Sequence, residues 1–219
     1  MRTGKASLKL FAGLLVVALI GAACGGDNEP SAGSTPKKTG AATTKAADVR
    51  ALLNSLLSQH VFLAASATGA ALGGRAAQFE AAKTAVLETN ATQLADAVGS
   101  VYGAEARAAF LPLWQKHIGF VVDYTSNFGN KAKQDKAVAD LLAYTEEFGA
   151  FIEGATEKIL PKAAVADLVK NHILTLKAVI DAQQKKDFAA VYPALITAYD
   201  HMDMIAKGLA SAIEQQGRI

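Results

Sequence analysis

The sequence predicts an all-α domain, a bundle of six helices that run alternately up and down. Apolar residues recur at helical spacing along most of the chain. The composition is rich in alanine and holds only five prolines, which favours helix. No segment alternates between apolar and polar residues as a half-buried strand does. A short solenoid of helix pairs is the alternative arrangement of the same elements.

Three of the six expected helices carry a clear apolar stripe. The first stripe covers 49–67, the third helix carries a stripe over 110–124, and the fifth over 165–179. Between and after them we expect helices at about 75–99, 131–157 and 187–215. Turn-forming residues mark the breaks: Gly73-Gly74, Tyr102-Gly103, Gly129-Asn130, Leu160-Pro161 and Lys185-Lys186-Asp187.

A short pattern occurs three times, once in each odd-numbered helix. It consists of Leu, a large apolar residue, two further residues, His and a β-branched residue, and its histidines are His60, His117 and His172. The intervals of 57 and 55 residues each fit one helical hairpin. When the second helices of the three hairpins are aligned in the same way, Asn90, Glu147 and His201 occupy equivalent positions. The chain is therefore predicted to consist of three tandem hairpins, which must pack together to bury their stripes.

The first 46 residues have the pattern of an exported chain. Basic residues precede an apolar run of about a dozen residues, which is typical of a signal peptide over 1–23. Cys24 follows two alanines at the position where bacterial lipoproteins receive their lipid. Residues 24–46 are rich in Gly, Ser, Thr, Pro and charged residues, which predicts a disordered tether. The helical domain is expected over 47–219.

Lipidation of Cys24 is favoured over simple secretion with a free thiol. Gly21 stands where such signals usually have Leu, so the match is incomplete. Cys24 is, however, the only cysteine of the chain, and a free exposed thiol outside the cell would invite cross-linking. We therefore expect an extracytoplasmic domain anchored by its lipid to the outer face of the cell membrane.

Composition and motifs argue against two classes of function. The net charge is only +2, and the lysines form no basic stripe interleaved with aromatic residues, so nucleic acid is not an expected partner. The sequence holds no His-Glu-x-x-His zinc motif, no Glu-x-x-His di-iron motif and no nucleophile elbow. Enzymatic activity is therefore not expected.

Two explanations account for histidines on buried stripes. In the first, each imidazole is a packing residue that hydrogen-bonds to the paired helix. In the second, the imidazoles converge on a bound metal or haem. The His201-Met202-Asp203-Met204 segment supports the second explanation, because imidazole and thioether ligands suit copper, particularly Cu(I). The candidate metal ligands are His201, Met202 and Met204, with help from His60, His117, His172 and Glu147.

The chain also resembles a known group of helical domains. The resemblance rests on Ser100-Val101-Tyr102-Gly103, on the segment from Leu113 to Thr125 and on Ala198-Tyr199-Asp200-His201-Met202. It is to a helical repeat domain of secreted and envelope proteins of Gram-positive bacteria, some labelled as containing a copper amine oxidase N-terminal domain. It covers 47–216 and implies an envelope location and an all-helical repeat. It implies no catalytic residues.

These observations favour a non-enzymatic binding domain displayed on the cell surface. Its partner would be another envelope protein or the cell wall, and the membrane would be contacted through the lipid. The alternative is a protein that binds copper or another transition metal through the residues named above.

Overall fold

The computed structural model describes residues 41–219 of the 219-residue chain. The predicted signal peptide, Cys24 and the tether up to residue 40 lie outside the described residues. The helices are α1 (Ala41–Leu72), α2 (Ala76–Thr84), the π-helical segment η1 (Ala85–Asn90), α3 (Ala91–Tyr102), α4 (Ala104–Ser126), α5 (Lys131–Ala155), α6 (Lys162–Lys185) and α7 (Phe188–Gln215).

The prediction of six helices is confirmed, because α2, η1 and α3 follow one another without a break. No strand occurs within 41–219, as an all-α fold requires. α1 begins at Ala41, so residues 41–46 of the expected tether belong to the first helix. That segment contains three alanines, the residue with the highest helix propensity.

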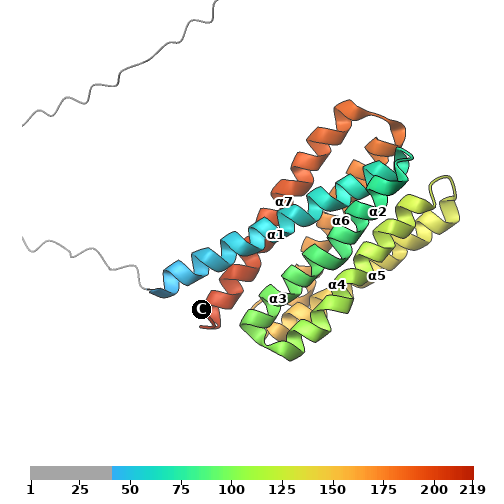
Figure 1. Cartoon of the computed structure of the whole chain (residues 1–219). Helices are drawn as coiled ribbons and strands as arrows, with labels where there is room; N and C mark the ends of the chain where they lie inside the picture. Colours follow the sequence, from blue (N-terminus) through green and yellow to red (C-terminus); the bar gives the residue numbers. More distant parts are fainter. Residues whose placement is uncertain (1–40) are drawn as a thin grey trace, which may run out of the picture. The chain divides into compact units, whose positions relative to one another are not determined.

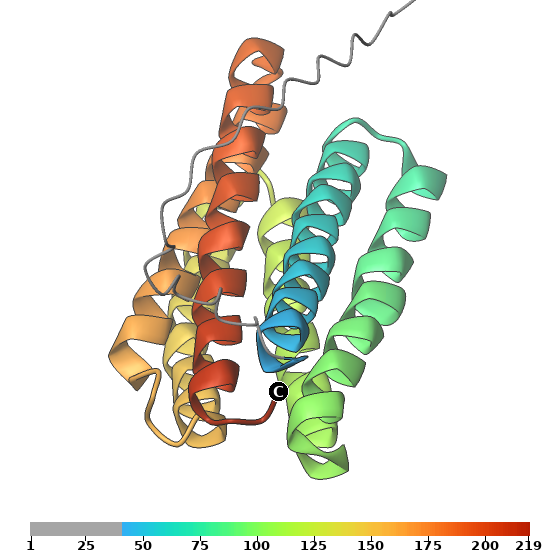
Figure 2. The ribbon, with the colours of Figure 1, turned by 90° about the vertical axis from the view of Figure 1, so that its left-hand side faces the viewer.

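Neighbours in sequence are neighbours in space. α1 packs on α2, α3 on α4, α4 on α5, α5 on α6 and α6 on α7, and α7 returns to pack along α1 (Figure 1). α1 also contacts α4 and α6. Figure 2 shows α7 beside α1, with the C-terminus near the beginning of α1. The bundle is therefore closed, and the three histidine-bearing helices meet inside it.

The turns between the helices use the residues that the sequence indicated. Gly74, Gly103 and Gly129 have φ angles of 70°, 91° and 87°, in the region that favours glycine. At two helix starts a side chain caps the first turn: Asn130 accepts a hydrogen bond from the Lys133 amide, and Asp187 accepts one from the Ala190 amide. These caps and glycines fix where each helix begins and ends.

The π-helical segment directs Asn90 into the core. A π turn holds more residues than an α turn and so rotates the side chains that follow it. Asn90 is 1% exposed, and its amide Nδ2 donates a hydrogen bond of 2.9 Å to the Leu56 carbonyl. α1 and the second helix of the first hairpin are thereby joined in the bundle interior.

The backbones of α5 and α6 approach each other closely at Gly149. A Cβ atom added at Gly149 would lie 2.6 Å from the Lys162 carbonyl oxygen. Such a contact can be relieved only by moving one helix away from the other, since both atoms are tied to backbone. Gly208, in α7, has nothing within 4 Å of the equivalent position.

Gly149→Ala should therefore lower the free energy of unfolding by about 1–3 kcal/mol, because it forces α5 and α6 apart. Gly208→Ala is the matched control. It should raise the free energy by roughly 0.5–1 kcal/mol, because alanine loses less backbone entropy than glycine on forming a helix. Urea unfolding followed by circular dichroism measures both values. Equal effects of the two substitutions would contradict the packing described for Gly149.

Candidate functional site: a cluster of three histidines

The three repeated histidines meet at the centre of the bundle. His60 lies on α1, His117 on α4 and His172 on α6, and their exposed fractions are 1%, 3% and 4%. Each ring offers a nitrogen, and the three nitrogens lie within 4.8 Å of one another. The Nε2 atoms of His60 and His117 are 3.3 Å apart. We call this group the histidine cluster.

Aromatic side chains surround the histidine cluster. The Trp114 ring lies edge-on to His117 with centroids 4.6 Å apart, and it is 5.0 Å from His60. Tyr144 of α5 stacks on His117, with ring centroids 5.1 Å apart. Because these rings are large and stiff, they hold the imidazoles in place and keep water from them.

Burial keeps the three imidazoles neutral. It lowers the pKa of His117 from 6.5 to about 3, with repulsion from His172 adding to the shift. It likewise lowers the pKa of His172 to about 4, with a further contribution from His201. Burial, then His117 and His172, hold the pKa of His60 well below 6.5. Neutral imidazole is the form that binds a metal ion.

Several polar atoms around the cluster lack hydrogen-bond partners. The Nδ1 atoms of His60, His117 and His172 are buried and unpaired within the described residues, as are the Tyr144 hydroxyl and the Trp114 indole nitrogen. Each such atom costs roughly 1–3 kcal/mol. Tight packing alone does not account for a bundle centre that carries this cost.

The cluster has the donor type and nearly the spacing of a metal site. Two nitrogens bound to one tetrahedral zinc or similar ion, at about 2.0–2.1 Å each, stand about 3.3 Å apart. The His60–His117 distance of 3.3 Å already has that value. The widest separation, 4.8 Å at most, would have to shorten by up to about 1.5 Å for all three nitrogens to bind one ion. Three imidazoles leave a fourth position of a tetrahedral ion open.

The other predicted ligands lie in three different environments. His201 is 9% exposed, and its Nε2–H donates a 2.8 Å hydrogen bond to the Leu168 carbonyl. Met202 is 1% exposed and borders the same cavity as His117 and His172. Met204 is 58% exposed. Glu147 is half exposed and pairs with Lys116 at 2.6 Å. The structure therefore groups the three repeated histidines, with Met202 beside the same cavity, and leaves Met204 and Glu147 at the surface.

The aligned positions of the even-numbered helices keep a common role in two of the three hairpins. Asn90 bonds to the carbonyl four residues before His60, and His201 bonds to the carbonyl four residues before His172. In the middle hairpin Glu147 points outward instead. These bonds hold the histidine-bearing helices against their partners, so Asn90 and His201 position the cluster from outside it.

Trp114 and Tyr144 were not among the predicted site residues, although both contact the cluster. Trp114 directly follows the Leu of the repeated pattern, where the other copies have Leu57 and Val169. Trp114 is the one aromatic residue at this position of the three copies, and this difference could have indicated a role at the site. Tyr144 lies one turn before Phe148 on the buried face of α5, and the sequence alone does not distinguish it from other core positions.

Comparison of the chain with protein-family models, with curated proteins and with solved structures found no match. Within residues 41–219, no helix combines the length and apolar character needed to cross a membrane.

The depressed pKa values predict a loss of stability in mild acid. Below pH 6.5 the unfolded chain binds protons on His117 and His172 that the folded chain does not bind until the pH nears 4 or 3. Between pH 7 and pH 5 each histidine should therefore remove roughly 2 kcal/mol from the free energy of unfolding. Urea titrations at several pH values, with a chelator present, measure the effect.

His117→Phe is the variant that isolates this contribution, since it keeps a ring of similar size without a titrating nitrogen. Between pH 7 and pH 5, the free energy of unfolding of this variant should fall by roughly 2 kcal/mol less than that of the unaltered chain. A free energy of unfolding that stays constant from pH 7 to pH 5 in the unaltered chain would contradict neutral buried imidazoles.

Proposed function

We propose that this protein is a non-enzymatic lipoprotein of the cell envelope whose helical domain binds one transition-metal ion at the histidine cluster. The observation that carries the proposal is the convergence of His60, His117 and His172, from three separate hairpins, within 4.8 Å. Apolar residues at these positions would pack the hairpins without leaving buried nitrogens unpaired, whereas a shared ligand gives the three histidines a common role.

The chemistry of the donors favours a borderline or soft metal. Imidazole suits zinc, copper, iron and nickel, and a thioether adds preference for Cu(I). Met202 supplies a buried thioether at the cavity that His117 and His172 also border. Among the soft metals we therefore propose copper as the ion, with zinc as the competitor that the same three histidines would accept.

The location outside the cell rests on the sequence of the first 46 residues. The basic start, the apolar run and Cys24 together fit a lipoprotein signal. The single cysteine is consistent with a site that relies on nitrogen and thioether donors where thiols oxidise. We propose that the lipid on Cys24 holds the domain at the outer face of the membrane.

Binding of another envelope protein is a second candidate function, favoured by the outer surface of α7. Phe188, Tyr192, Ile196 and Tyr199 follow one another at helical spacing, and their exposed fractions range from 49% to 66%. A row of apolar side chains of this size is typical of an interaction surface. If the metal experiment below gives no binding, the histidines are packing residues and this surface becomes the leading candidate site.

The metal proposal predicts that the purified protein retains about one copper or zinc ion per chain after desalting. Replacing His60, His117 or His172 with phenylalanine should lower the affinity for the metal at least tenfold, because two imidazoles bind a metal much more weakly than three. Elemental analysis and titration with Cu(I), Cu(II) and Zn²⁺ measure the stoichiometry and affinity. Circular dichroism verifies that each variant remains folded.

Met204→Leu and Met202→Leu form the matched pair of controls. Met204→Leu should leave every affinity unchanged, since Met204 is at the surface, whereas Met202→Leu should weaken Cu(I) and spare Zn²⁺. Metal content no higher than that of a bundle lacking all three histidines would refute the proposal. Loss of binding in Met204→Leu would move the site to the His201–Met204 segment.

Lipid attachment predicts that Cys24→Ser releases the protein from the membrane. The unaltered chain should sediment with membranes and carry the mass of a diacylglyceryl group on its first mature residue. The serine variant should appear in the medium without that mass, because serine offers no thiol for the thioether. Fractionation and mass spectrometry of the two chains test this, and an unmodified Cys24 thiol in the exported chain would show simple secretion instead.

A further inference from the structure

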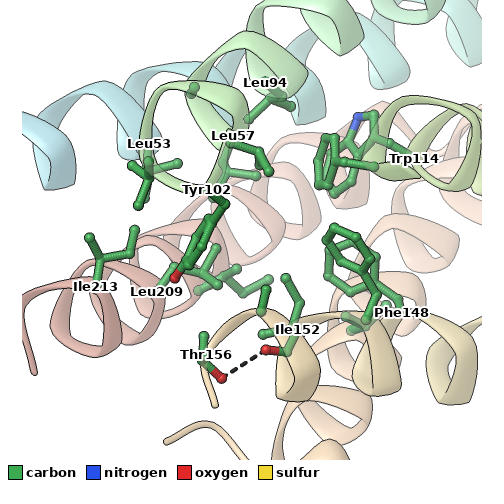
Figure 3. Close-up of a pocket in the computed structure, with 18 of the residues that line it drawn as sticks. Leu53, Leu57, Leu94, Tyr102, Trp114, Phe148, Ile152, Thr156, Leu209 and Ile213 are labelled. Carbon is green, nitrogen blue, oxygen red and sulfur yellow. Dashed lines mark hydrogen bonds between the residues drawn. The ribbon is translucent and has the colours of Figure 1, made fainter. Parts of the chain in front are cut away.

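A narrow apolar pocket runs from the histidine cluster toward the end of the bundle where α1 begins. Figure 3 shows Leu53, Leu57 and Leu94 on one side of it and Phe148, Ile152 and Ile213 on the opposite sides. Its volume is about 80 Å³, counted over the positions that the centre of a water-sized sphere can take. A single water needs roughly 10–15 Å³ by that measure. The pocket therefore has room for a ligand of several heavy atoms.

The pocket walls select against polar ligands. None of the described residues that line it carries a charge or a side-chain amide. Two hydroxyls in the lining already have partners: Thr156 donates to the Ile152 carbonyl at 2.7 Å, as drawn in Figure 3, and Tyr102 donates to Gln216 at 2.8 Å. The imidazoles of His117 and His172 at its inner end are neutral. The unpaired Tyr144 hydroxyl, the Trp114 indole nitrogen and the Nδ1 atoms of these two histidines also belong to lining residues, but these atoms are buried and not accessible from the pocket. Water in the pocket would therefore find few hydrogen bonds, which favours an apolar ligand.

The shape of the pocket selects a chain over a compact molecule. Its lining on α7 extends from Met202 to Ile213, which at 1.5 Å per residue is about 16 Å along the helix. A volume of about 80 Å³ spread over such a length leaves a slender channel. A single unbranched hydrocarbon chain has these proportions, and a fused ring system does not.

The outer end of the pocket includes lining residues that are exposed to solvent. Leu52 of α1, at 47% exposed, and the exposed Ser100 of α3 belong to its lining, so the mouth lies between these helices. On the opposite side the C-terminal residues close it. Gln216 joins Tyr102 to the Ala155 carbonyl through two hydrogen bonds, and the Arg218 guanidinium lies 4.9 Å from the Tyr102 ring. A chain can enter between α1 and α3 while its polar end stays in water.

We propose that this pocket binds one unbranched aliphatic chain of a lipid or fatty acid, inserted between α1 and α3 with its methyl end toward the histidine cluster. The proposal rests on the apolar walls of the pocket, so it does not depend on metal binding. It would make the protein a carrier or sensor of single-chain amphiphiles.

The test uses Trp114, which is the only tryptophan of the chain and lies in the pocket wall. The purified, metal-free protein is titrated with 12-bromododecanoic acid, whose bromine quenches tryptophan fluorescence at contact. We expect saturable quenching that dodecanoic acid reverses and that 1-adamantanecarboxylic acid, with the same headgroup on a compact cage, does not. Absence of saturable quenching would overturn the proposal, and equal competition by the adamantane acid would overturn the inference that the ligand is a chain.

Two alanine-to-phenylalanine variants provide the matched comparison. Ala97, on α3, lines the pocket, whereas Ala194, on α7, is equally half-buried against the same core but does not line it. Ala97→Phe should weaken the affinity at least tenfold, and Ala194→Phe should leave it within twofold. Unchanged affinity in a folded Ala97→Phe variant would overturn the proposed location. If that variant does not fold, the competition between the two acids still decides the question.

A further experiment distinguishes whether the aliphatic chain belongs to a membrane lipid or to a free acid. Vesicles of phosphatidylcholine with brominated acyl chains are added in place of the free acid. Quenching by these vesicles would identify a membrane lipid as the natural occupant, and quenching by the free acid alone would identify a soluble amphiphile. Quenching by neither would refute the proposal.

Discussion

The structure depends on keeping three imidazoles neutral and close together in the centre of a helical bundle. Burial on this scale disfavours the protonated form so strongly that the pKa of His117 falls to about 3. The rings stay there because α1, α4 and α6 each direct one face inward, and because Trp114 and Tyr144 enclose them. The hydrogen bonds of Asn90 and His201 to carbonyls one turn before His60 and His172 then set how these helices sit against their partners.

The helices and most of their limits followed from local sequence, whereas the start of the first helix and the meeting of the histidines did not. Gly103, Gly129 and Asp187 end or cap helices by conformations that depend on a few neighbouring residues, so they could be identified without a tertiary structure. The burial of His60 was likewise predictable from its place on a stripe. Convergence depends on the order and rotation of the helices around the bundle, which no local pattern specifies.

The His201–Met204 segment illustrates the same limit. Residues two apart on a helix point in nearly opposite directions, because each residue turns the helix by about 100°. Met202 and Met204 therefore cannot both face the core, and the structure buries Met202 and exposes Met204. A sequence pattern can place soft donors beside one another along the chain, but helix geometry decides which of them share a space. Glu147 likewise lies at the surface, where it pairs with Lys116.

The three repeated histidines also bear on how such a site could originate. The sequence predicts three similar hairpins, and the histidine that each of them carries lies at one point of the bundle. A single hairpin with one histidine on its apolar face, assembled as a homotrimer, would bring three identical imidazoles together without any further change. Fusion of three gene copies would then preserve the arrangement within one chain and free the copies to diverge, which would fit the different residues at Asn90, Glu147 and His201. On this view one histidine codon, copied twice, was sufficient to create the entire cluster.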